Sequence, residues 1–420
     1  MPHPAPSRRR VAGPALVGAL LALVPLLVTP GPALAAPAPA PVPAAARGAA
    51  VKPVPASTVE YLVSTPPASP FEPWCHPGEL APCGLGNDLI QRLDAVPAGG
   101  RVDVVMYSTT RGDLAQALVD AAARGVAVRL LTSHPKPDGE RSGDVADRVQ
   151  VLVDQLRALE RPVKVGWGSL TRSGHAGIEH RKLVLIDPDP AVDGDEQTIS
   201  DSGNWTYSLD TAHNDRTVVT DRCLYVATRR HLAVLWKDRT ARRTGPLSTC
   251  DGRRRLWMMP EARTDPVLTW AKGATCGPGS RVTFANFYLS TSKSGLVDEL
   301  VRFRRAGAYV QVAANDELTG HYSTRLKRRM VAAGLKVYDV SVLLDPVSGR
   351  KVYDHQKSLA ATGCGPAFSA QGSTTQNTTA YTRNGNAVLT STVYADAAAM
   401  QVGFEAMVAG THRLSAADLG

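Results

Sequence analysis

Aromatic side chains are scarce in this 420-residue sequence, at 5%, while charged residues (20%) and apolar residues (44%) are present in ordinary amounts. These fractions argue against a disordered chain, a collagen and a multi-span membrane protein. After residue 35, no apolar run reaches the roughly 18 residues of a membrane-spanning helix. The basic stretch 325–329 has no aromatic residue and 227–243 has one, Trp236, so the sequence does not predict a stacking platform for single-stranded nucleic acid.

No two cysteines have the C-x-x-C spacing, which argues against a zinc ribbon, and no other cluster has ligand spacing. We therefore expect no metal and no other cofactor. The six cysteines all follow residue 35, and an even number in an exported protein favours disulfides. Six cysteines allow fifteen pairings. From nearness along the chain alone, the expected pairs are Cys75–Cys83, Cys223–Cys250 and Cys276–Cys364.

The first 56 residues have the composition of a targeting segment and a linker. Three arginines at 8–10 precede an apolar run, and Ala33-Leu34-Ala35 has the A-x-A form of a cleavage site. This pattern predicts a signal peptide over 1–35, with a membrane anchor as the alternative, and a Pro/Ala-rich extended linker over 36–56. The mature protein is expected to be soluble and secreted. Its positive charge, +9 for the whole chain, favours anionic partners such as nucleic acid or a phospholipid surface without choosing between them.

The rest of the chain contains an internal repeat of strands and helices. Apolar periodicity predicts strand 101–110, helix 113–125 and strand 126–132, then strand 281–290, helix 295–307 and strand 308–314. Each copy continues with a helix (about 143–159 and 323–333) and a short strand (163–166 and 335–340). This order indicates an α/β fold with two mixed-sheet halves, 57–250 and 251–420, related by a pseudo-two-fold axis. Two unrelated α/β pieces are the alternative.

Each copy contains an H-x-K motif at the start of a predicted strand. The first motif is His180 with Lys182, and the second is His355 with Lys357. Side chains alternate along a strand, so the histidine and lysine of each motif project from one face. One H-x-K motif is a weak signal, but one at the same place in each copy is much stronger. A two-fold axis would bring both pairs to a shared site.

A small polar segment follows each motif. The first contains Ser202 and Asn204, and the second contains Gly372-Ser373. Thirteen residues beyond Ser202 lies Asp215, and the same distance beyond Ser373 lies Asn386. The equal spacing supports the duplication.

Together these residues resemble the phospholipase D superfamily, whose mark is H-x-K-x4-D followed by G-S-x-N, present twice. The first copy matches at His180, Lys182, Asp187, Ser202 and Asn204, with Asp201 in place of the glycine. The second copy matches at His355, Lys357, Gly372 and Ser373, and departs at Thr362, Thr375 and Asn386. The resemblance implies a duplicated fold with the active site between the halves.

The chemistry of phosphodiester cleavage suggests a role for each matched residue. Lys182 and Lys357 would stabilise the charge on the phosphoryl oxygens. One histidine attacks phosphorus and the other transfers protons; we assign His180 as the nucleophile and His355 as the acid and base. Asp215 is expected to orient His180. Asp187 is placed with the catalytic residues, and its expected role is to support the structure more than to take part in the chemistry. Phosphate binding is expected from Ser202, Asn204 and Ser373.

The resemblance implies a secreted phosphodiesterase that hydrolyses glycerophospholipids to phosphatidic acid and a head-group alcohol through a phosphohistidine. The expected partner is a phospholipid or a membrane surface, and the expected state is a monomer. Two alternatives stay open. The positive charge favours a metal-independent secreted nuclease of the same superfamily, and the departures at Thr362, Thr375 and Asn386 favour a non-catalytic binding protein with a degenerate second half.

Overall fold

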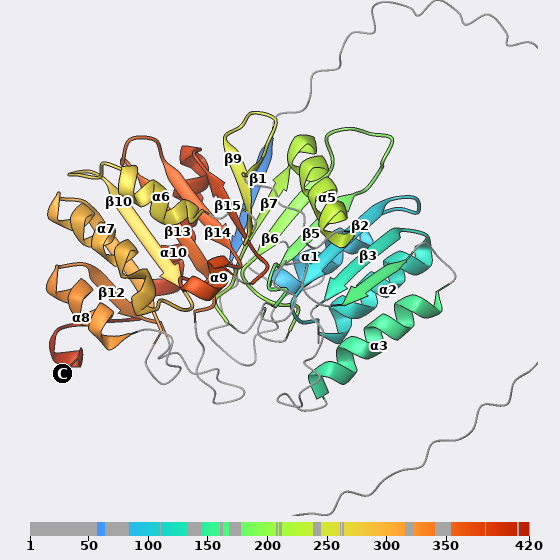
Figure 1. Ribbon diagram of the computed structural model, residues 1–420, viewed down its shortest axis with the longest axis horizontal. Helices are drawn as coiled ribbons and strands as arrows, with labels where there is room; N and C mark the ends of the chain where they lie inside the picture. The colour runs from blue at the N-terminus through green and yellow to red at the C-terminus, as the bar shows by residue number, and fades with distance from the viewer. Residues whose placement is uncertain are drawn as a thin grey trace, which may run out of the picture. The chain divides into compact units, whose positions relative to one another are not determined.

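Two mixed β-sheets, one from each half of the chain, form the frame of the computed structural model (Figure 1). The structure describes residues 57–63, 84–109, 111–132, 144–159, 163–167, 178–206, 209, 212–237, 245–260, 262, 264–315, 323–340, 354–382, 384–409 and 411–419. The expected signal peptide, the linker and the Cys75–Cys83 pair lie outside these residues. Among the helices formed by the described residues, none has both the length and the apolarity needed to cross a membrane.

The first sheet has the strand order β1-β7-β6-β5-β2-β3-β4. Its strands are β1 (Thr58–Val63), β2 (Arg101–Met106), β3 (Ala127–Thr132), β4 (Lys164–Trp167), β5 (Leu183–Asp187), β6 (Gln197–Asp201) and β7 (Asp215–Thr220). β2, β3 and β4 pair in parallel, with Val102 opposite Val128, and the other neighbours pair antiparallel.

The second sheet has the strand order β16-β12-β11-β10-β13-β14-β15-β9-β8. Its strands are β8 (Leu247–Ser248), β9 (Arg254–Met259), β10 (Arg281–Asn286), β11 (Tyr309–Ala314), β12 (Lys336–Asp339), β13 (Lys357–Thr362), β14 (Phe368–Gly372), β15 (Asn386–Ser391) and β16 (His412–Arg413). β10, β11 and β12 are parallel, as β2, β3 and β4 are in the first sheet. The sheets therefore repeat one order, with β1 beside β7 in the first and β9 beside β15 in the second.

The helices follow the same repeat. They are α1 (Leu85–Asp94), α2 (Gly112–Arg124), α3 (Asp144–Ala158), α5 (Arg222–Lys237), α6 (Pro266–Gly273), α7 (Ser294–Arg305), α8 (Thr324–Ala332), α9 (Thr378–Thr382) and α10 (Tyr394–Val408). α2 is followed by Gly125 at φ 100°, and α7 is followed one residue later by Gly307 at φ 99°. Glycine reaches this left-handed region without a Cβ penalty, which explains why both helices stop where the sequence predicts.

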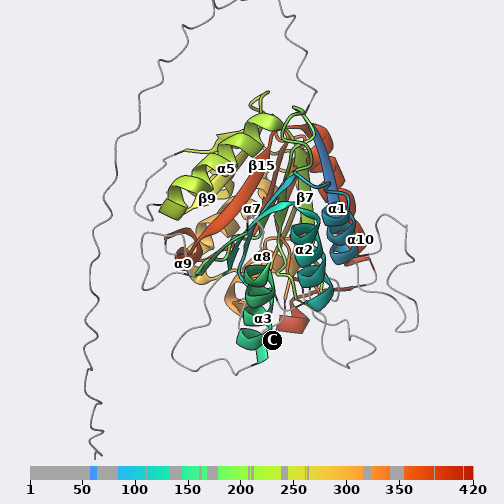
Figure 2. The ribbon, with the colours of Figure 1, turned by 90° about the vertical axis from the view of Figure 1, so that its right-hand side faces the viewer.

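Alternating side chains of the first sheet divide its core into two layers. Val104 and Val184 pack with α1 and α2 on one face, while Val105 and Leu183 pack with α5 on the other. Figure 2 shows α5 on one side of the sheets and α1 and α2 on the opposite side. In the second half, α6, α7 and α8 cover one face and α10 covers the other.

The two halves share part of their core. The layer beneath α5 also contains Leu256 and Met258 of β9 and Leu389 of β15, which belong to the second sheet. The core of residues packed around α10 includes Tyr61 of β1, which belongs to the first sheet. Each half thus packs against the helix that ends the other half's repeat, and this packing fixes the position of one copy against the other.

Two of the three expected disulfides are confirmed. Cys223–Cys250 joins the first turn of α5 to the segment after β8, with a Cα–Cα distance of 5.1 Å. Cys276–Cys364 joins the segment before β10 to the turn between β13 and β14, with a Cα–Cα distance of 4.2 Å. Asp221 lies close to Cys223 and Cys250, and the three together have the spacing of possible metal ligands. The two sulfurs are bonded to each other, however, and the Asp221 carboxylate accepts from the Leu224 N–H. Asp221 therefore acts as the N-cap of α5.

Candidate active site between the two copies

The first H-x-K motif stands immediately before the fully buried strand β5, and the second overlaps the start of the fully buried strand β13, whose first residue is Lys357. The two lysines make the same contact, because Lys182 Nζ donates to the His180 carbonyl at 2.9 Å and Lys357 Nζ donates to the His355 carbonyl at 2.5 Å. Lys357 also donates to the Ser202 carbonyl of the first copy at 3.4 Å. The ammonium of the second motif therefore reaches the polar segment of the first.

The backbone of each catalytic segment is held by the opposite copy. Glu179 forms a parallel bridge with Gly385, and His213 forms the equivalent bridge with Asp354. The His180 N–H donates to the Gly385 carbonyl at 2.7 Å. The His355 N–H donates to the His213 carbonyl at 2.9 Å. The two crossings are related by the pseudo-two-fold, and they bring both motifs to the junction of the halves.

The two imidazoles are also oriented across the junction. His180 Nδ1 lies 2.9 Å from Asn386 Oδ1, and His355 Nδ1 lies 3.0 Å from Asn214 Oδ1. A carboxamide oxygen only accepts, so Nδ1 of each imidazole carries a proton, and Nε2 of each ring is the nitrogen left for the substrate. Ser373 Oγ and Ser202 Oγ donate to the same two amide oxygens, at 3.2 and 3.4 Å.

The prediction that Asp215 orients His180 is therefore wrong. The residue that contacts the His180 imidazole is Asn386 of the second copy. Counting thirteen residues from each serine makes Asp215 the equivalent of Asn386. The contacts of the two serines show a correspondence that differs from this by one residue. Ser202 Oγ accepts from the Asp215 N–H and Ser373 Oγ accepts from the Ala387 N–H, both at 2.9 Å. Asp215 thus corresponds to Ala387, and a shift of one residue moves a side chain to the other face of a strand.

Asp215 lies instead in a buried polar group on the other face of β7. Its Oδ2 accepts from Tyr61 Oη at 3.3 Å, and its Oδ1 accepts from Gln371 Nε2 at 3.2 Å. Burial, which is the largest effect, raises the pKa of this carboxyl group, and the hydrogen bonds oppose the rise.

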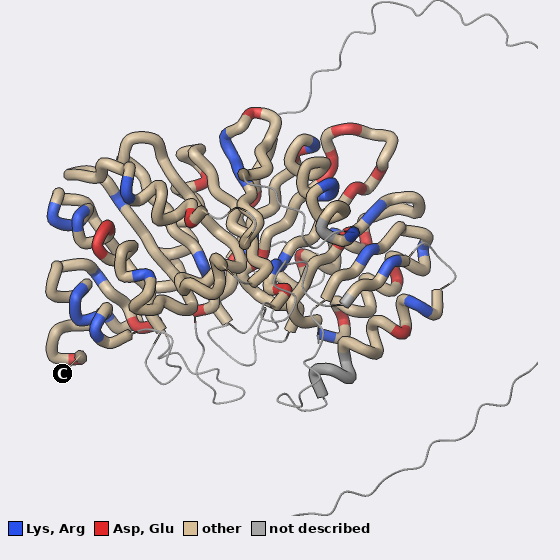
Figure 3. Tube along the Cα trace, viewed as in Figure 1, with Lys and Arg blue, Asp and Glu red and all other residues tan. Residues whose placement is uncertain are grey.

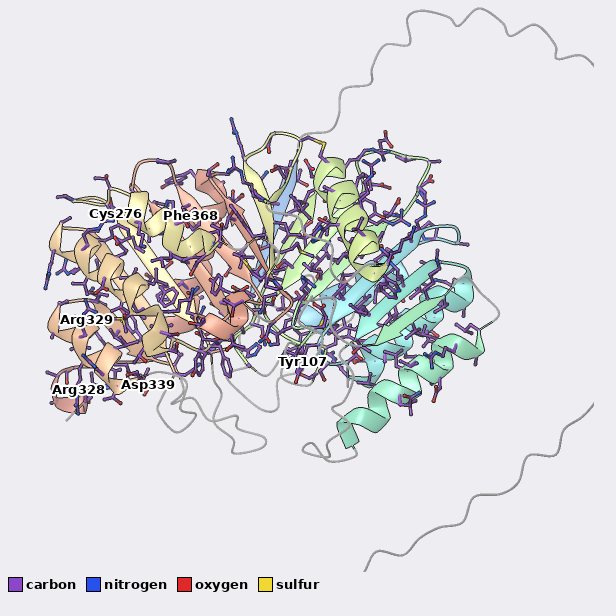
Figure 4. All side chains as sticks on the ribbon, viewed as in Figure 1. Tyr107, Cys276, Arg328, Arg329, Asp339 and Phe368 are labelled. Atoms are coloured by element: carbon purple, nitrogen blue, oxygen red, sulfur yellow. A yellow bond between two sulfur atoms is a disulfide. The ribbon has the colours of Figure 1, made fainter. Side chains whose placement is uncertain are left out.

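One aromatic ring stands beside each imidazole. Tyr107 and His180 have ring centroids 5.4 Å apart, and Phe287 and His355 have centroids 4.8 Å apart, with an interplanar angle of 55° in both pairs. Both aromatic residues follow the first strand of the parallel group, and Figure 4 shows Tyr107 near the junction. Sequence reasoning missed them, although the aligned segments RVDVVMY and RVTFANF carry the signal.

Comparison with known proteins finds one family model that matches the first half of the chain. Residues 89–236 match the family model described as "Cardiolipin synthase, PLD-like domain", and this stretch contains the whole first motif. The first half of the chain is therefore similar to a phospholipase D-like domain. Comparison with curated protein sequences gives no match.

The phospholipase D fold extends over both halves. Phosphatidylserine synthase from Haemophilus influenzae Rd KW20 has a similar structure, with a TM-score of 0.58 at 10% identity, covering 80% of this chain and 86% of that one. Polyphosphate kinase from Porphyromonas gingivalis has a TM-score of 0.49 at 11% identity over 84% of this chain, which spans 50% of the kinase. Yeast tyrosyl-DNA phosphodiesterase has a TM-score of 0.47 at 8% identity, covering 80% of this chain and 89% of that one.

The charges around His180 keep its imidazole neutral. Burial lowers the pKa of His180 well below its usual value, and the nearby ammonium groups of Lys182 and Lys357 lower it further. The hydrogen bonds to Asn386 and to the backbone of Ser373 oppose this shift. A neutral imidazole with its Nε2 lone pair available is the form that attacks phosphorus.

Both lysines have lowered pKa values. Burial lowers the pKa of Lys182 well below its usual value, with a further contribution from Lys357. Burial also lowers the pKa of Lys357 to about 7, while Asp354 and Asp215 oppose the shift. Two ammonium groups that burial destabilises are an arrangement that an anion would stabilise, and a phosphodiester is such an anion.

The expected phosphate-binding residues divide into two groups. The hydroxyls of Ser202 and Ser373 already hold the asparagines that orient the imidazoles. Asn204 is half-buried, and its Oδ1 has no hydrogen-bond partner among the described residues. Phosphate binding stays a prediction for all three, and of these only Asn204 has a side-chain oxygen with no partner in the described part of the chain.

Asp187 and Asp201 lie in structural networks. Asp187 is at the end of β5 opposite Arg101, where its Oδ2 accepts from Tyr225 Oη at 3.2 Å. His180 precedes the other end of that strand, so Asp187 does not contact it. Asp201, which stands in the place of the motif glycine, forms a fully buried ion pair with Arg216 at 2.6 Å. The equivalent residue in the second copy is Gly372, where a Cβ would lie 2.2 Å from the Ala387 carbonyl oxygen.

Trp205, which follows Asn204, is completely buried among the apolar residues that α1 and α2 cover in the first half.

Proposed function

We propose that this chain is a secreted phosphodiesterase of the phospholipase D type that hydrolyses glycerophospholipids to phosphatidic acid and a head-group alcohol. The observation that carries the proposal is the reciprocal orientation of the two imidazoles, His180 by Asn386 and His355 by Asn214, beside two buried lysines. Export rests on the leader-like first 35 residues. The preference for lipid rests on export together with the superfamily.

The proposed reaction has two steps at one phosphorus atom. His180 Nε2 attacks phosphorus, the new P–N bond forms, and the P–O bond to the head group breaks with its electron pair on the leaving oxygen. His355 delivers a proton to that oxygen. His355 Nε2 then removes a proton from water, which attacks phosphorus, and the P–N bond breaks to return neutral His180. Lys182 and Lys357 stabilise the charge on the phosphoryl oxygens in both steps.

The chemistry is tested with purified protein in EDTA and an aryl phosphodiester. We expect His180→Ala and His355→Ala each to lower turnover by about 10³-fold or more, because each removes a group that changes bonds in both steps. His412→Ala is the matched control, since that imidazole is exposed and pairs with Asp418 at 3.2 Å. Mass spectrometry of acid-sensitive phosphate on the peptide containing His180 detects the intermediate. Near-wild-type turnover by either active-site variant contradicts the mechanism.

The substrate class is tested by comparing phospholipid vesicles with plasmid DNA under the same conditions. Release of phosphatidic acid without nicking supports the lipid enzyme. Nicking without release of phosphatidic acid favours the nuclease, the second candidate, for which the observation is the arginine-rich end of the molecule formed by α7 and α8 (Figure 3). Turnover of neither, nor of the aryl phosphodiester, favours a binding protein.

A further inference from the structure

An open groove lies at the opposite end of β10 from the catalytic motif of the second copy. Its volume is about 580 Å³, and it is lined by Gly279, Ser280, Arg281, Gly307, Tyr309 and Glu405. β10 begins at Arg281, and its last residue, Asn286, pairs with Lys357. The strand between them spans about 17 Å at the usual rise of about 3.3 Å per residue. The groove is therefore separate from the junction of the two copies.

Two cations and a tyrosine stand beside this groove at the starts of three neighbouring parallel strands. Arg281 begins β10, Tyr309 begins β11 and Lys336 begins β12. Lys336 Nζ donates to Tyr309 Oη at 2.7 Å and lies 4.4 Å from the centre of the tyrosine ring. The guanidinium carbon of Arg281 lies 5.8 Å from the same ring centre, within the distance at which an aromatic ring attracts a cation. The Arg281 side chain is 37% exposed and Tyr309 is 38% exposed, so both are accessible to a ligand.

The positive and negative charges of the groove are unequal. Arg281 forms an ion pair with Glu405 of α10, and it also donates to Gln311 Oε1 at 3.2 Å. Both contacts are made by Nη2, and Nε has no hydrogen-bond partner among the described residues, so the guanidinium can bind a further acceptor. Lys336 Nζ gives one of its three hydrogens to Tyr309, and the Tyr309 hydroxyl keeps its own proton to donate. Two cations against one carboxylate leave a net positive charge and three groups that can donate.

The turn that leads into β10 forms a fixed rim of the groove. The Cys276–Cys364 disulfide ties the start of this turn to the segment after β13, and Figure 4 labels Cys276 at this end of the second half. Ser280 Oγ accepts from the Gly277 N–H at 3.0 Å and donates to the Gly363 carbonyl at 2.6 Å. A ligand that binds here has no rim to order, which removes one of the costs of binding.

We propose that this groove binds a phosphate monoester through Arg281, Tyr309 and Lys336. A monoester has three terminal oxygens for the three donors, whereas a carboxylate or a phosphodiester has two. Above pH 7 the monoester carries nearly two negative charges, because its second pKa is about 6, and this charge matches two cations better than a single charge does. The volume lies within the roughly 300–1,000 Å³ of small-molecule sites, which leaves room for the group that carries the phosphate. Binding of the phosphate replaces Glu405 as the partner of Arg281.

The monoester group occurs both on phosphatidic acid and on soluble molecules such as glycerol 3-phosphate, so the experiment offers it in both forms. The readout is acetylation of individual lysines in the purified protein, measured by mass spectrometry at pH 8, in EDTA and at constant ionic strength. Lys336 reports on the groove itself, so binding at the junction of the two copies does not disturb the reading. Lys272, an exposed lysine on α6, is the control.

Glycerol 3-phosphate should slow the acetylation of Lys336. We expect half-protection at about 1 mM or below, an affinity that two or three charge-assisted hydrogen bonds supply. Protection grows as 1 + [L]/Kd, so about ten times that concentration should slow the reaction about tenfold, while Lys272 reacts at an unchanged rate. Dimethyl phosphate, a diester with one charge and two terminal oxygens, should protect Lys336 about tenfold more weakly.

Two substitutions should move the affinity in opposite directions. Arg281→Gln removes a guanidinium donor and should raise the half-protecting concentration about tenfold or more. Glu405→Gln removes the carboxylate that competes for Arg281 and should lower this concentration about threefold. Arg325→Gln, at an exposed arginine on α8, changes the net charge as Arg281→Gln does and should leave the concentration unchanged. Thermal unfolding shows whether each variant is folded, and the wild-type measurement stands without them.

Vesicles of digalactosyldiacylglycerol with and without about 20% phosphatidic acid present the monoester on a lipid. Protection by the vesicles that contain phosphatidic acid identifies a lipid source, and protection by glycerol 3-phosphate alone identifies a soluble one; both support the proposal. Equal protection by dimethyl phosphate, or no protection of Lys336 by any monoester, overturns it. A loss for Arg325→Gln as large as that for Arg281→Gln also overturns it, because the attraction then comes from overall charge. None of these results depends on turnover of a phosphodiester, so the proposed function is tested separately.

Discussion

Replacing Lys357 by methionine is expected to remove a pH-dependent part of the free energy of unfolding. The side chain is 5% exposed, and burial lowers the pKa of this ammonium group to about 7. In the unfolded chain a lysine titrates near 10.4. Between these values the unfolded chain binds a proton that the folded protein does not, so this group makes the free energy of unfolding rise with pH.

The magnitude follows from the two titration curves. From pH 7.0 to 8.5 the unfolded lysine stays charged while the folded one loses its remaining half proton, which integrates to about 1.6 kcal/mol. Urea unfolding at the two pH values measures the rise. The wild type should gain about 1.6 kcal/mol more than Lys357→Met, or about 0.5 M in the urea midpoint if the slope is about 3 kcal/mol/M.

Lys272→Met is the control, because Lys272 is an exposed lysine on α6. This variant should show the full wild-type rise. If Lys357→Met also shows the full rise, the buried ammonium does not titrate near neutral pH, and the reasoning about the site's charge is refuted. A wild type with no rise at all leads to the same conclusion.

Three further changes test the framework. Arg216→Met leaves the buried Asp201 carboxylate without its cation and removes one of the two cations that pair with Asp88. The change should cost about 3–5 kcal/mol, measured by urea unfolding at pH 7; a loss below about 1 kcal/mol contradicts the network. The Gly385 carbonyl accepts from the His180 N–H, and Gly385→Ala places a Cβ 2.6 Å from the buried Glu179 carboxylate oxygen. This variant should lower kcat/KM by about 10²-fold, while Gly273→Ala, with open space around it, should not. Replacing Cys276 and Cys364 by serine opens a loop of 88 residues and should lower the free energy of unfolding by about 4–5 kcal/mol, measured by thermal or urea unfolding. An unchanged free energy of unfolding contradicts the link between these two cysteines.

Much of the α/β frame could be predicted from sequence periodicity, because the two copies repeat the same apolar pattern. The predicted strands 101–110 and 281–290 end sooner in the structure, at Met106 and Asn286. Beyond the first of these, the Ser108 carbonyl accepts from the Trp205 N–H, so the chain has left the sheet to contact the polar segment. Such contacts between distant segments are not visible in local periodicity.

Other elements were missed for the same physical reason. β1 pairs with β7, with Thr58 opposite Thr220, and neither segment indicates this partner by itself. α10 is apolar on several sides because it packs against β13, β14 and β1, so it has no single stripe that marks an amphipathic helix. Only the three-dimensional arrangement shows that this helix needs to be buried on several sides.

At the site, the motifs identified both histidines and both lysines, but spacing alone could not identify their partners. Asn214 lies 12 residues beyond Ser202, and Asn386 lies 13 beyond Ser373, so the second copy contains one more residue in this stretch. Equal counting therefore selected Asp215. In a strand, one residue decides which face a side chain occupies, and the length of a loop cannot be read as a register.

The crossed hydrogen bonds have a consequence for how the two copies can change over time. Asn386 contacts the imidazole of the first copy, and Asn214 contacts the imidazole of the second. Neither copy therefore contains both a histidine and the asparagine that orients it. A substitution at either asparagine changes the surroundings of the imidazole in the other copy, so we expect the two segments to vary together. If the two copies were expressed as separate polypeptides, we expect neither to be active until the two associate.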